Sequence, residues 1–230
     1  RQKLESLVSI SNVLGYDTSF LHGAKNGSMG FQGFANTLGY DNYYGLDEFN
    51  NDNEYDGFWG IWDEPFLQFS KSVLDNKNEP FLATIFTLSS HEPYIIPDKF
   101  KGIFDNGYLP IHKCVGYTDY SIRQFFKSIE KLSWFENTVF IFTSDHTNQS
   151  YYKHYQSTVN RFATPLIIYN KNGDFKGVDN RLASHLDIYP TVAELIGYKK
   201  PFRSWGRSLL SSKNEPSFTI NYFGGGAYLS

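Results

Sequence analysis

The sequence is poor in cysteine, in surplus positive charge and in long apolar runs, and each shortage excludes a class of protein. A single cysteine, Cys114, in 230 residues rules out an internal disulfide framework. Lys and Arg together number 21 against 24 Asp and Glu, a formal net charge of −3. That balance leaves no excess of cations to neutralise a run of phosphates, which argues against nucleic acid as a partner. No apolar run approaches the ~20 residues that a membrane span needs.

Two common catalytic motifs are also missing. The sequence contains no G-x-S-x-G nucleophile elbow and no phosphate-binding P-loop. Cys114 lies at the start of an amphipathic segment, and free cysteine is among the most buried residue types. We therefore expect Cys114 to be packed rather than nucleophilic.

The composition is that of a folded enzyme-sized unit. With 40% hydrophobic and 20% charged residues, residues 1–230 are expected to form a single domain. Aromatic residues reach 18%, which fits a well-filled core and also a cleft for sugars or lipids. The chain begins at Arg1, without an initiator Met, inside a helix-like pattern, so we expect it to be a piece of a longer protein.

Helical and buried-strand patterns alternate along the chain. Strands are predicted at residues 18–21, 80–88, 138–143 and 165–169, and helices at residues 31–38, 63–74, 112–132 and 186–196. Residues 41–60 lack any period and are predicted to be a long surface loop. The alternation predicts an α/β fold, a mostly parallel sheet with helices on both faces, truncated at its N-terminus.

Three of the predicted strands are each followed by a histidine. These are His22, His91 and His146. If the strands share one parallel sheet, their carboxyl ends meet at one edge, where ligands bind in such folds. Asp145 directly precedes His146, and a carboxylate oxygen with a neutral imidazole nitrogen suits Zn or Mn. We therefore predict a metal-dependent site at that edge.

Six blocks of sequence, in order, carry a resemblance to a known family. They are FLHGAKNGSMGF (residues 20–31), FTLSSHEPY (86–94), GYTDYSIRQFF (116–126), NTVFIFTSDHT (137–147), HLDIYPTVAELIGY (185–198) and WGRSLL (205–210). With these blocks the chain resembles the sulfatase-like domain of the lipoteichoic acid synthase and phosphoglycerol transferase family, within the alkaline phosphatase superfamily.

The resemblance implies roles for four residues. Asp145 and His146 correspond to metal ligands, with Mn the expected metal and Zn, Mg or Ca as alternatives, while His22 and His91 correspond to substrate-binding residues that contact the phosphate. The family's other two ligands, a Glu and the nucleophilic Thr, are expected upstream of Arg1. The chain itself would then hold no nucleophile, bind the metal weakly or not at all, and show no turnover alone. Relatives of the teichoic acid type carry an acidic residue at the position of Ala24. This difference leaves the identity of the substrate's head group undetermined.

The implied activity is that of a metal-dependent phosphoglycerol transferase or sulfatase-like enzyme acting on phosphate or sulfate esters of cell-envelope lipids or glycans. The threonine would attack the phosphorus of a phosphoglycerol lipid and release diacylglycerol. An anionic lipid or glycan is the expected partner. The expected location is the cell membrane, with this domain outside the cytoplasm and held by transmembrane helices missing from this chain.

Alternatives remain at two levels. A sulfatase-like hydrolase of glycans is one, and a non-catalytic module of the same fold that binds glycan or lipid head groups is another. For His185, capping or packing at a helix start is favoured over a second-metal ligand. Trp59, Trp62 and Asp63 fit either the rim of a cleft or the core.

Overall fold

The computed structural model describes residues 4–157, 159–211, 218–221 and 226–229. Its helices are α1 (Leu7–Val13), α2 (Phe31–Leu38), α3 (Leu46–Phe49), α4 (Asp63–Leu74), α5 (Ile111–Ile129), α6 (Ser133–Glu136) and α7 (Ile188–Leu195). Its strands are β1 (Asp17–His22), β2 (Asn42–Tyr44), β3 (Phe81–Phe86), β4 (Val139–Thr143), β5 (Leu166–Asn170), β6 (Phe218–Asn221) and β7 (Gly226–Leu229).

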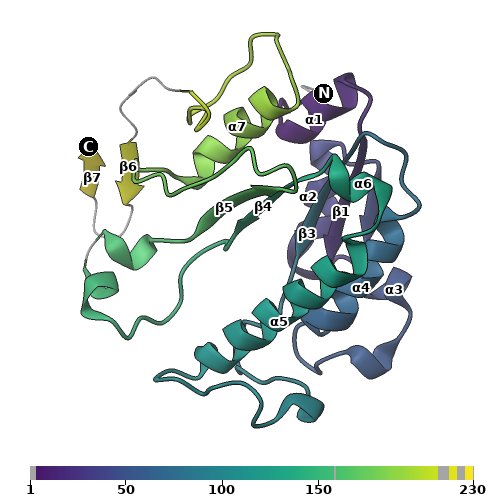
Figure 1. Ribbon diagram of the computed structural model, residues 1–230, viewed down its shortest axis with the longest axis vertical. Helices are drawn as coiled ribbons and strands as arrows, with labels where there is room; N and C mark the ends of the chain where they lie inside the picture. The colour runs from purple at the N-terminus through teal and green to yellow at the C-terminus, as the bar shows by residue number, and fades with distance from the viewer. Residues whose placement is uncertain (1–3, 158, 212–217, 222–225, 230) are drawn as a thin grey trace.

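Three parallel strands form the sheet that organises the molecule, in the order β2-β1-β3 (Figure 1). The central strand β1 pairs with β3 along its full length, from Asp17 opposite Phe81 to His22 opposite Phe86. Because the pairing is parallel and in register, the loops that follow β1 and β3 leave the sheet at the same edge.

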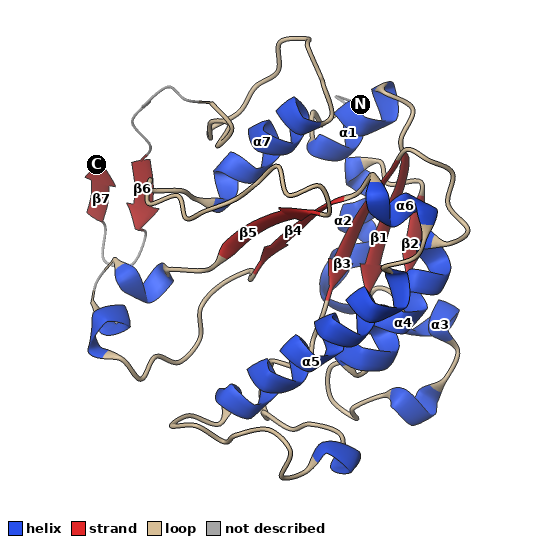
Figure 2. Ribbon diagram, viewed as in Figure 1, coloured by secondary structure: helices blue, strands red, loops and turns tan. Residues whose placement is uncertain are grey.

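Helices cover both faces of this sheet (Figure 2). Successive side chains of β1 point to opposite faces, as in any strand. Phe20 packs against Phe31 of α2, with ring centroids 6.0 Å apart. The next residue, Leu21, belongs to a buried cluster with Phe66 of α4 on the other face. The predicted α/β class, with a parallel sheet between helices, is therefore confirmed.

A second apolar cluster joins α4 and α5 to the strands. It is formed by Leu67, Leu74, Phe125, Ile129, Trp134 and Phe135, and Phe81 of β3 and Phe140 of β4 pack against it. Burying side chains of this size removes most of their apolar surface from water, about 1.5–3 kcal/mol for each fully buried one. Because Phe81 and Phe140 pack against the same cluster, β4 lies close to β3.

The placement of residues 138–143 and 165–169 in one parallel sheet with the other strands is wrong. β4 and β5 pair with each other, antiparallel, from Val139 opposite Asn170 to Thr143 opposite Leu166. A parallel connection needs a crossover, usually an α-helix. The described residues between β4 and β5 hold only the short 3₁₀ turns Lys153–Gln156 and Asn160–Phe162, so the chain turns back on itself.

Residues 41–60 are also more ordered than predicted. They contain β2, which pairs with β1 from Ser19 opposite Asn42 to Leu21 opposite Tyr44, and the single-turn helix α3. A three-residue strand is too short to show a sequence period, and it exists because β1 offers it backbone partners. The predicted helices at about residues 31–38 and 63–74 are confirmed as α2 and α4, although Asp63, expected to cap the second, is its first residue.

Cys114 is packed, as expected. It is fully buried on α5, and burial raises the pKa of its thiol to about 11, so it carries no thiolate at neutral pH. None of the helices in the described ranges combines the length and the apolar character needed to cross a bilayer.

Gly60 lies where two backbone segments meet, and its lack of a side chain is required there. A Cβ on Gly60 would stand 2.5 Å from the carbonyl oxygen of Gly23. We expect Gly60→Ala to lower the free energy of unfolding by about 1–3 kcal/mol, because rigid backbone must shift. Gly33, exposed within α2 with no atom within 4 Å of its Cβ position, is the matched control. Gly33→Ala should raise stability by about 0.5–1 kcal/mol. Urea denaturation of both variants checks this, and equal stability of the two would contradict it.

Candidate functional site

His22 ends β1 and is buried. Its side chain is 1% exposed and packs between the rings of Phe31 and Phe86, with centroids at 4.4 and 5.5 Å. Nδ1 lies 3.2 Å from the hydroxyl of Tyr43 on β2. Nε2 has no hydrogen-bond partner in the described part of the chain. Burial lowers the pKa of this imidazole from 6.5 to about 4, so the ring is neutral at physiological pH.

The loop after β3 is held by a buried carboxylate. Asp63, fully buried at the start of α4, accepts hydrogen bonds from the backbone N–H groups of Leu88 (3.1 Å) and Ser89 (2.9 Å). Its other oxygen accepts one from the Thr118 hydroxyl of α5, at 2.6 Å. Burial raises the pKa of Asp63, and these hydrogen bonds oppose that rise. Asp63 therefore belongs to the core and sets the shape of the loop that carries His91.

His91 itself lies on the surface beside Trp59. The two ring centroids are 3.8 Å apart, and the Trp59 indole N–H donates to the Glu92 carbonyl at 2.5 Å. The backbone N–H of Ile61, two residues after Trp59, donates to the Gly23 carbonyl at 2.9 Å. The segment that carries Trp59 thus bridges the ends of β1 and β3, which fits the rim suggested for this tryptophan.

Asp145 and His146 follow β4 as an exposed pair. Asp145 Oδ2 lies 3.4 Å from His146 Nε2, and the two side chains are 52% and 67% exposed. Protein ligands lie about 2.1 Å from Zn, so one ion of this size can contact both atoms at that separation. His146 Nδ1 lies 2.7 Å from the Thr147 carbonyl oxygen. A proton on Nδ1 donated to this carbonyl leaves the Nε2 lone pair free, the arrangement usual for metal-binding histidine.

The residues therefore fit part of a metal site. No group of three or more His, Cys, Asp and Glu side chains that could hold a metal occurs within the described residues. Asp145 and His146 provide two ligand atoms, while catalytic zinc sites usually draw three from the protein.

Two contacts tie the turn at Asp145 to the rest of the molecule. The Tyr94 hydroxyl, in the His91 loop, donates to Glu92 Oε1 at 3.3 Å, and the Asn148 side chain lies close enough to that hydroxyl to act on its pKa. His185 Nε2 lies 2.7 Å from the Ser144 carbonyl oxygen, immediately before Asp145. His185 is exposed, and Ser184 supplies the helix cap through a capping box with Asp187, so neither the capping nor the packing role expected for His185 is seen.

The three predicted strand ends are thus linked through neighbours. Gly23 and the Trp59 segment connect the end of β1 to His91, and Tyr94 with Asn148 connects the His91 loop to the turn at Asp145. His91, Asp145 and His146 are exposed, whereas His22 is covered by aromatic rings. A role for His22 in contacting substrate stays a prediction that requires movement of a covering ring.

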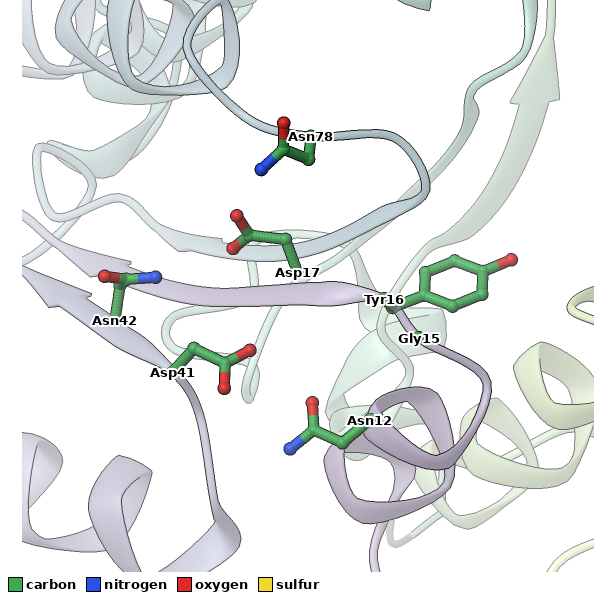
Figure 3. Close-up of a pocket in the computed structure, with 7 residues that line it drawn as sticks. All are labelled: Asn12, Gly15, Tyr16, Asp17, Asp41, Asn42 and Asn78. Atoms are coloured by element: carbon green, nitrogen blue, oxygen red, sulfur yellow. The ribbon is translucent and has the colours of Figure 1, made fainter.

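An open hollow of about 430 Å³ lies at the opposite edge of the sheet (Figure 3). It is lined by Asn12, Gly15, Tyr16, Asp17, Asp41, Asn42 and Asn78. Both acidic side chains of this hollow bind other parts of the protein. Asp17 forms an ion pair with Lys77 at 3.0 Å, and Asp41 accepts hydrogen bonds from the backbone N–H and the hydroxyl of Thr18. These bonds fix the amino-terminal ends of β1 and β2, away from the residues predicted to be functional.

Sequence reasoning missed two residues of this region. Tyr43 lies in a segment predicted to be loop, and only its pairing with β1 brings its hydroxyl to His22. Asn148 follows the Asp-His pair, but nothing in its sequence context indicates that it lies beside the Tyr94 hydroxyl.

The architecture is that of the alkaline phosphatase superfamily. A protein of this superfamily from Vibrio parahaemolyticus superposes with a TM-score of 0.80 at 26% identity, over 96% of this chain and 55% of that one. The lipoteichoic acid synthase LtaP from Listeria monocytogenes shares the fold, with a TM-score of 0.71 at 20% identity over 86% of this chain and 54% of that one. Within this class, the sulfatase family model matches residues 1–198, so the chain belongs to the sulfatase family.

Curated relatives lie in the group that the motifs predicted. Lipoteichoic acid synthase 1 of Bacillus subtilis is 24% identical over 220 residues, 87% of this chain and 34% of the relative. The chain therefore spans about a third of the length of the curated relatives that it matches. The family resemblance is therefore confirmed.

The buried neutral imidazole of His22 predicts a pH-dependent stability. Between pH 6.5 and about 4 the unfolded chain protonates His22 while the folded chain does not, so stability falls as pH decreases through this window. A pKa difference of this size lowers the free energy of unfolding by at most about 3 kcal/mol. Urea denaturation at pH 7, 6, 5 and 4.5 measures it. His22→Gln should flatten the profile, and His154→Ala, at an exposed position, should not. Equal slopes for wild type and His22→Gln would contradict the prediction.

Proposed function

We propose that the protein containing this chain is a metal-dependent transferase that cleaves the phosphate ester of a phosphoglycerol lipid. The proposal is carried by the paired Asp145 Oδ2 and His146 Nε2, 3.4 Å apart and open to solvent. It is supported by the match of the chain to the sulfatase family and by its similarity to lipoteichoic acid synthases.

In this proposal Asp145 and His146 hold one divalent ion, for which manganese is the first candidate. An ion held by these two residues would supply Lewis-acid chemistry, which lowers the pKa of an oxygen nucleophile and offsets negative charge on phosphoryl oxygens. The nucleophilic threonine and a glutamate ligand are expected in the part of the protein before Arg1. The backbone carbonyl of Thr147 accepts a hydrogen bond from the Nδ1–H of His146 and so keeps the imidazole ring oriented.

His91 and His22 supply hydrogen bonds to the ester. His91 is exposed beside Trp59 and can meet a ligand from solvent. Donors placed in advance where negative charge builds up are worth more than donors that must be ordered during the reaction. The rigid support of the His91 loop by Asp63 favours such placement.

The function is tested with full-length protein in vesicles that contain phosphatidylglycerol and Mn²⁺, by following diacylglycerol release. Asp145→Asn and His146→Ala should each lower the rate by a factor on the order of 100 or more, because charge stabilisation is lost. Asp119→Asn and His154→Ala are matched controls at exposed positions and should stay within about twofold of wild type, as surface changes cost little.

The outcomes separate the alternatives. Diacylglycerol release that survives both Asp145→Asn and His146→Ala would refute the role of the pair. Hydrolysis of a sulfated glycan without lipid cleavage would favour a sulfatase-like hydrolase. Binding of glycan or lipid head groups with neither reaction would favour a non-catalytic module.

An anionic lipid substrate also implies a location. We propose that this domain works outside the cytoplasm, at the membrane surface, with the anchor in the rest of the protein. In intact cells, added protease should then degrade the domain, and a domain that stays protected until the cells are lysed would contradict this location.

A further inference from the structure

His22 presents an unusual combination: a fully covered imidazole with one nitrogen bonded and the other without a partner. Nδ1 lies 3.2 Å from the Tyr43 hydroxyl, while Nε2 is buried and makes no hydrogen bond among the described residues. Leaving a buried polar group unpaired costs about 1–3 kcal/mol, so such a group calls for an explanation.

The contact with Tyr43 selects between the two neutral tautomers. A phenol O–H is a more acidic donor than an imidazole N–H, and an unprotonated imidazole nitrogen is a good acceptor. If Tyr43 donates to Nδ1, the ring proton is on Nε2 and only that N–H lacks a partner. In the reverse arrangement, both Nε2 and the Tyr43 O–H would lack partners among the described residues, which is less favourable.

The surroundings keep both groups neutral. Burial lowers the pKa of His22 to about 4, with desolvation as the cause. Burial, followed by the negative charge of Glu48, raises the pKa of Tyr43, so its hydroxyl keeps its proton. The neutral ring then carries one proton, and the hydrogen bond with Tyr43 determines which of the two ring nitrogens carries it.

We propose that Tyr43 is a positioning residue that fixes the Nε2–H tautomer of His22, so that Nε2 is a hydrogen-bond donor to an oxygen of the ester. This inference rests on the proposed function, in which His22 binds the substrate. It assigns Tyr43 a role although this residue touches no substrate itself.

Access to Nε2 requires one of the covering rings to move. Phe86 is held in β3, paired with β1. Phe31 is the first residue of α2 and follows Met29 and Gly30, which have φ values of 50° and 77°. A Phe31 rotamer change is therefore the smaller rearrangement, since it leaves the sheet intact.

The tautomer can be observed directly by NMR. In the 230-residue chain labelled with ¹⁵N-histidine at pH 7, long-range ¹H–¹⁵N correlations report which ring nitrogen carries the proton, and His22→Gln identifies the His22 signals. Wild type should show His22 protonated on Nε2, with Nδ1 at the shift of a hydrogen-bonded acceptor. In Tyr43→Phe the ¹⁵N chemical shift of Nδ1 should move to that of a nitrogen without a hydrogen bond. Signals of the Nδ1–H tautomer should also appear.

Tyr40→Phe is the matched control. Tyr40 and Tyr43 both pack against the Phe20 ring, with ring centroids 5.4 and 5.9 Å away, but the Tyr40 hydroxyl hydrogen-bonds Thr84 at 2.7 Å and not His22. Tyr40→Phe should leave the His22 signals unchanged. In full-length protein, Tyr43→Phe should lower kcat about tenfold, the effect of about 1.4 kcal/mol, with a smaller change in KM, and Tyr40→Phe should leave kcat within about twofold.

Three results would overturn the inference: a wild-type His22 protonated on Nδ1, an Nδ1 signal unchanged by Tyr43→Phe, or a full-length Tyr43→Phe variant with wild-type kcat. Full-length wild-type protein that cleaves no phosphoglycerol lipid or sulfate ester would instead refute the proposed function. The tautomer measured in the chain would stand in that case, so the two failures are distinguishable.

Discussion

The buried carboxylate of Asp63 is the interaction on which the candidate site depends. A carboxylate removed from water is costly unless hydrogen bonds replace its hydration. Here the backbone N–H groups of Leu88 and Ser89 and the hydroxyl of Thr118 do so. Because those donors belong to the loop after β3 and to α5, the hydrogen bonds to this one buried side chain fix both relative to α4.

The rest of the site extends from that junction. The same loop continues to His91, which contacts Trp59, and to Tyr94, which contacts Asn148 beside the Asp-His pair. Loops are the parts of a fold that most often carry function, and they do so accurately only when a rigid element supports them. In this chain the support comes from one carboxylate and from the clusters around α4 and α5.

Histidines of the same sequence are placed in opposite environments. His22 is enclosed by Phe31 and Phe86, which keeps the ring neutral, so that one ring nitrogen can donate a hydrogen bond and the other can accept one. His146 is open to solvent with Nε2 beside a carboxylate oxygen, an arrangement suited to a cation. Burial and neighbours, rather than residue type, separate the donor role proposed for His22 from the metal-ligand role proposed for His146.

The α/β class, the places of α2 and α4 and the family could all be predicted from the amino-acid sequence, because they depend on local periodicity and on short motifs such as the Asp145-His146 pair. Three features became visible only in the folded chain: β4 pairs antiparallel with β5, Tyr43 meets His22, and Asp63 holds the loop before His91. Each of these depends on which distant segment supplies a backbone or hydrogen-bond partner. A local pattern records a residue's preference for a conformation, but the partner that satisfies a strand edge or a buried polar atom is set by packing of the whole chain.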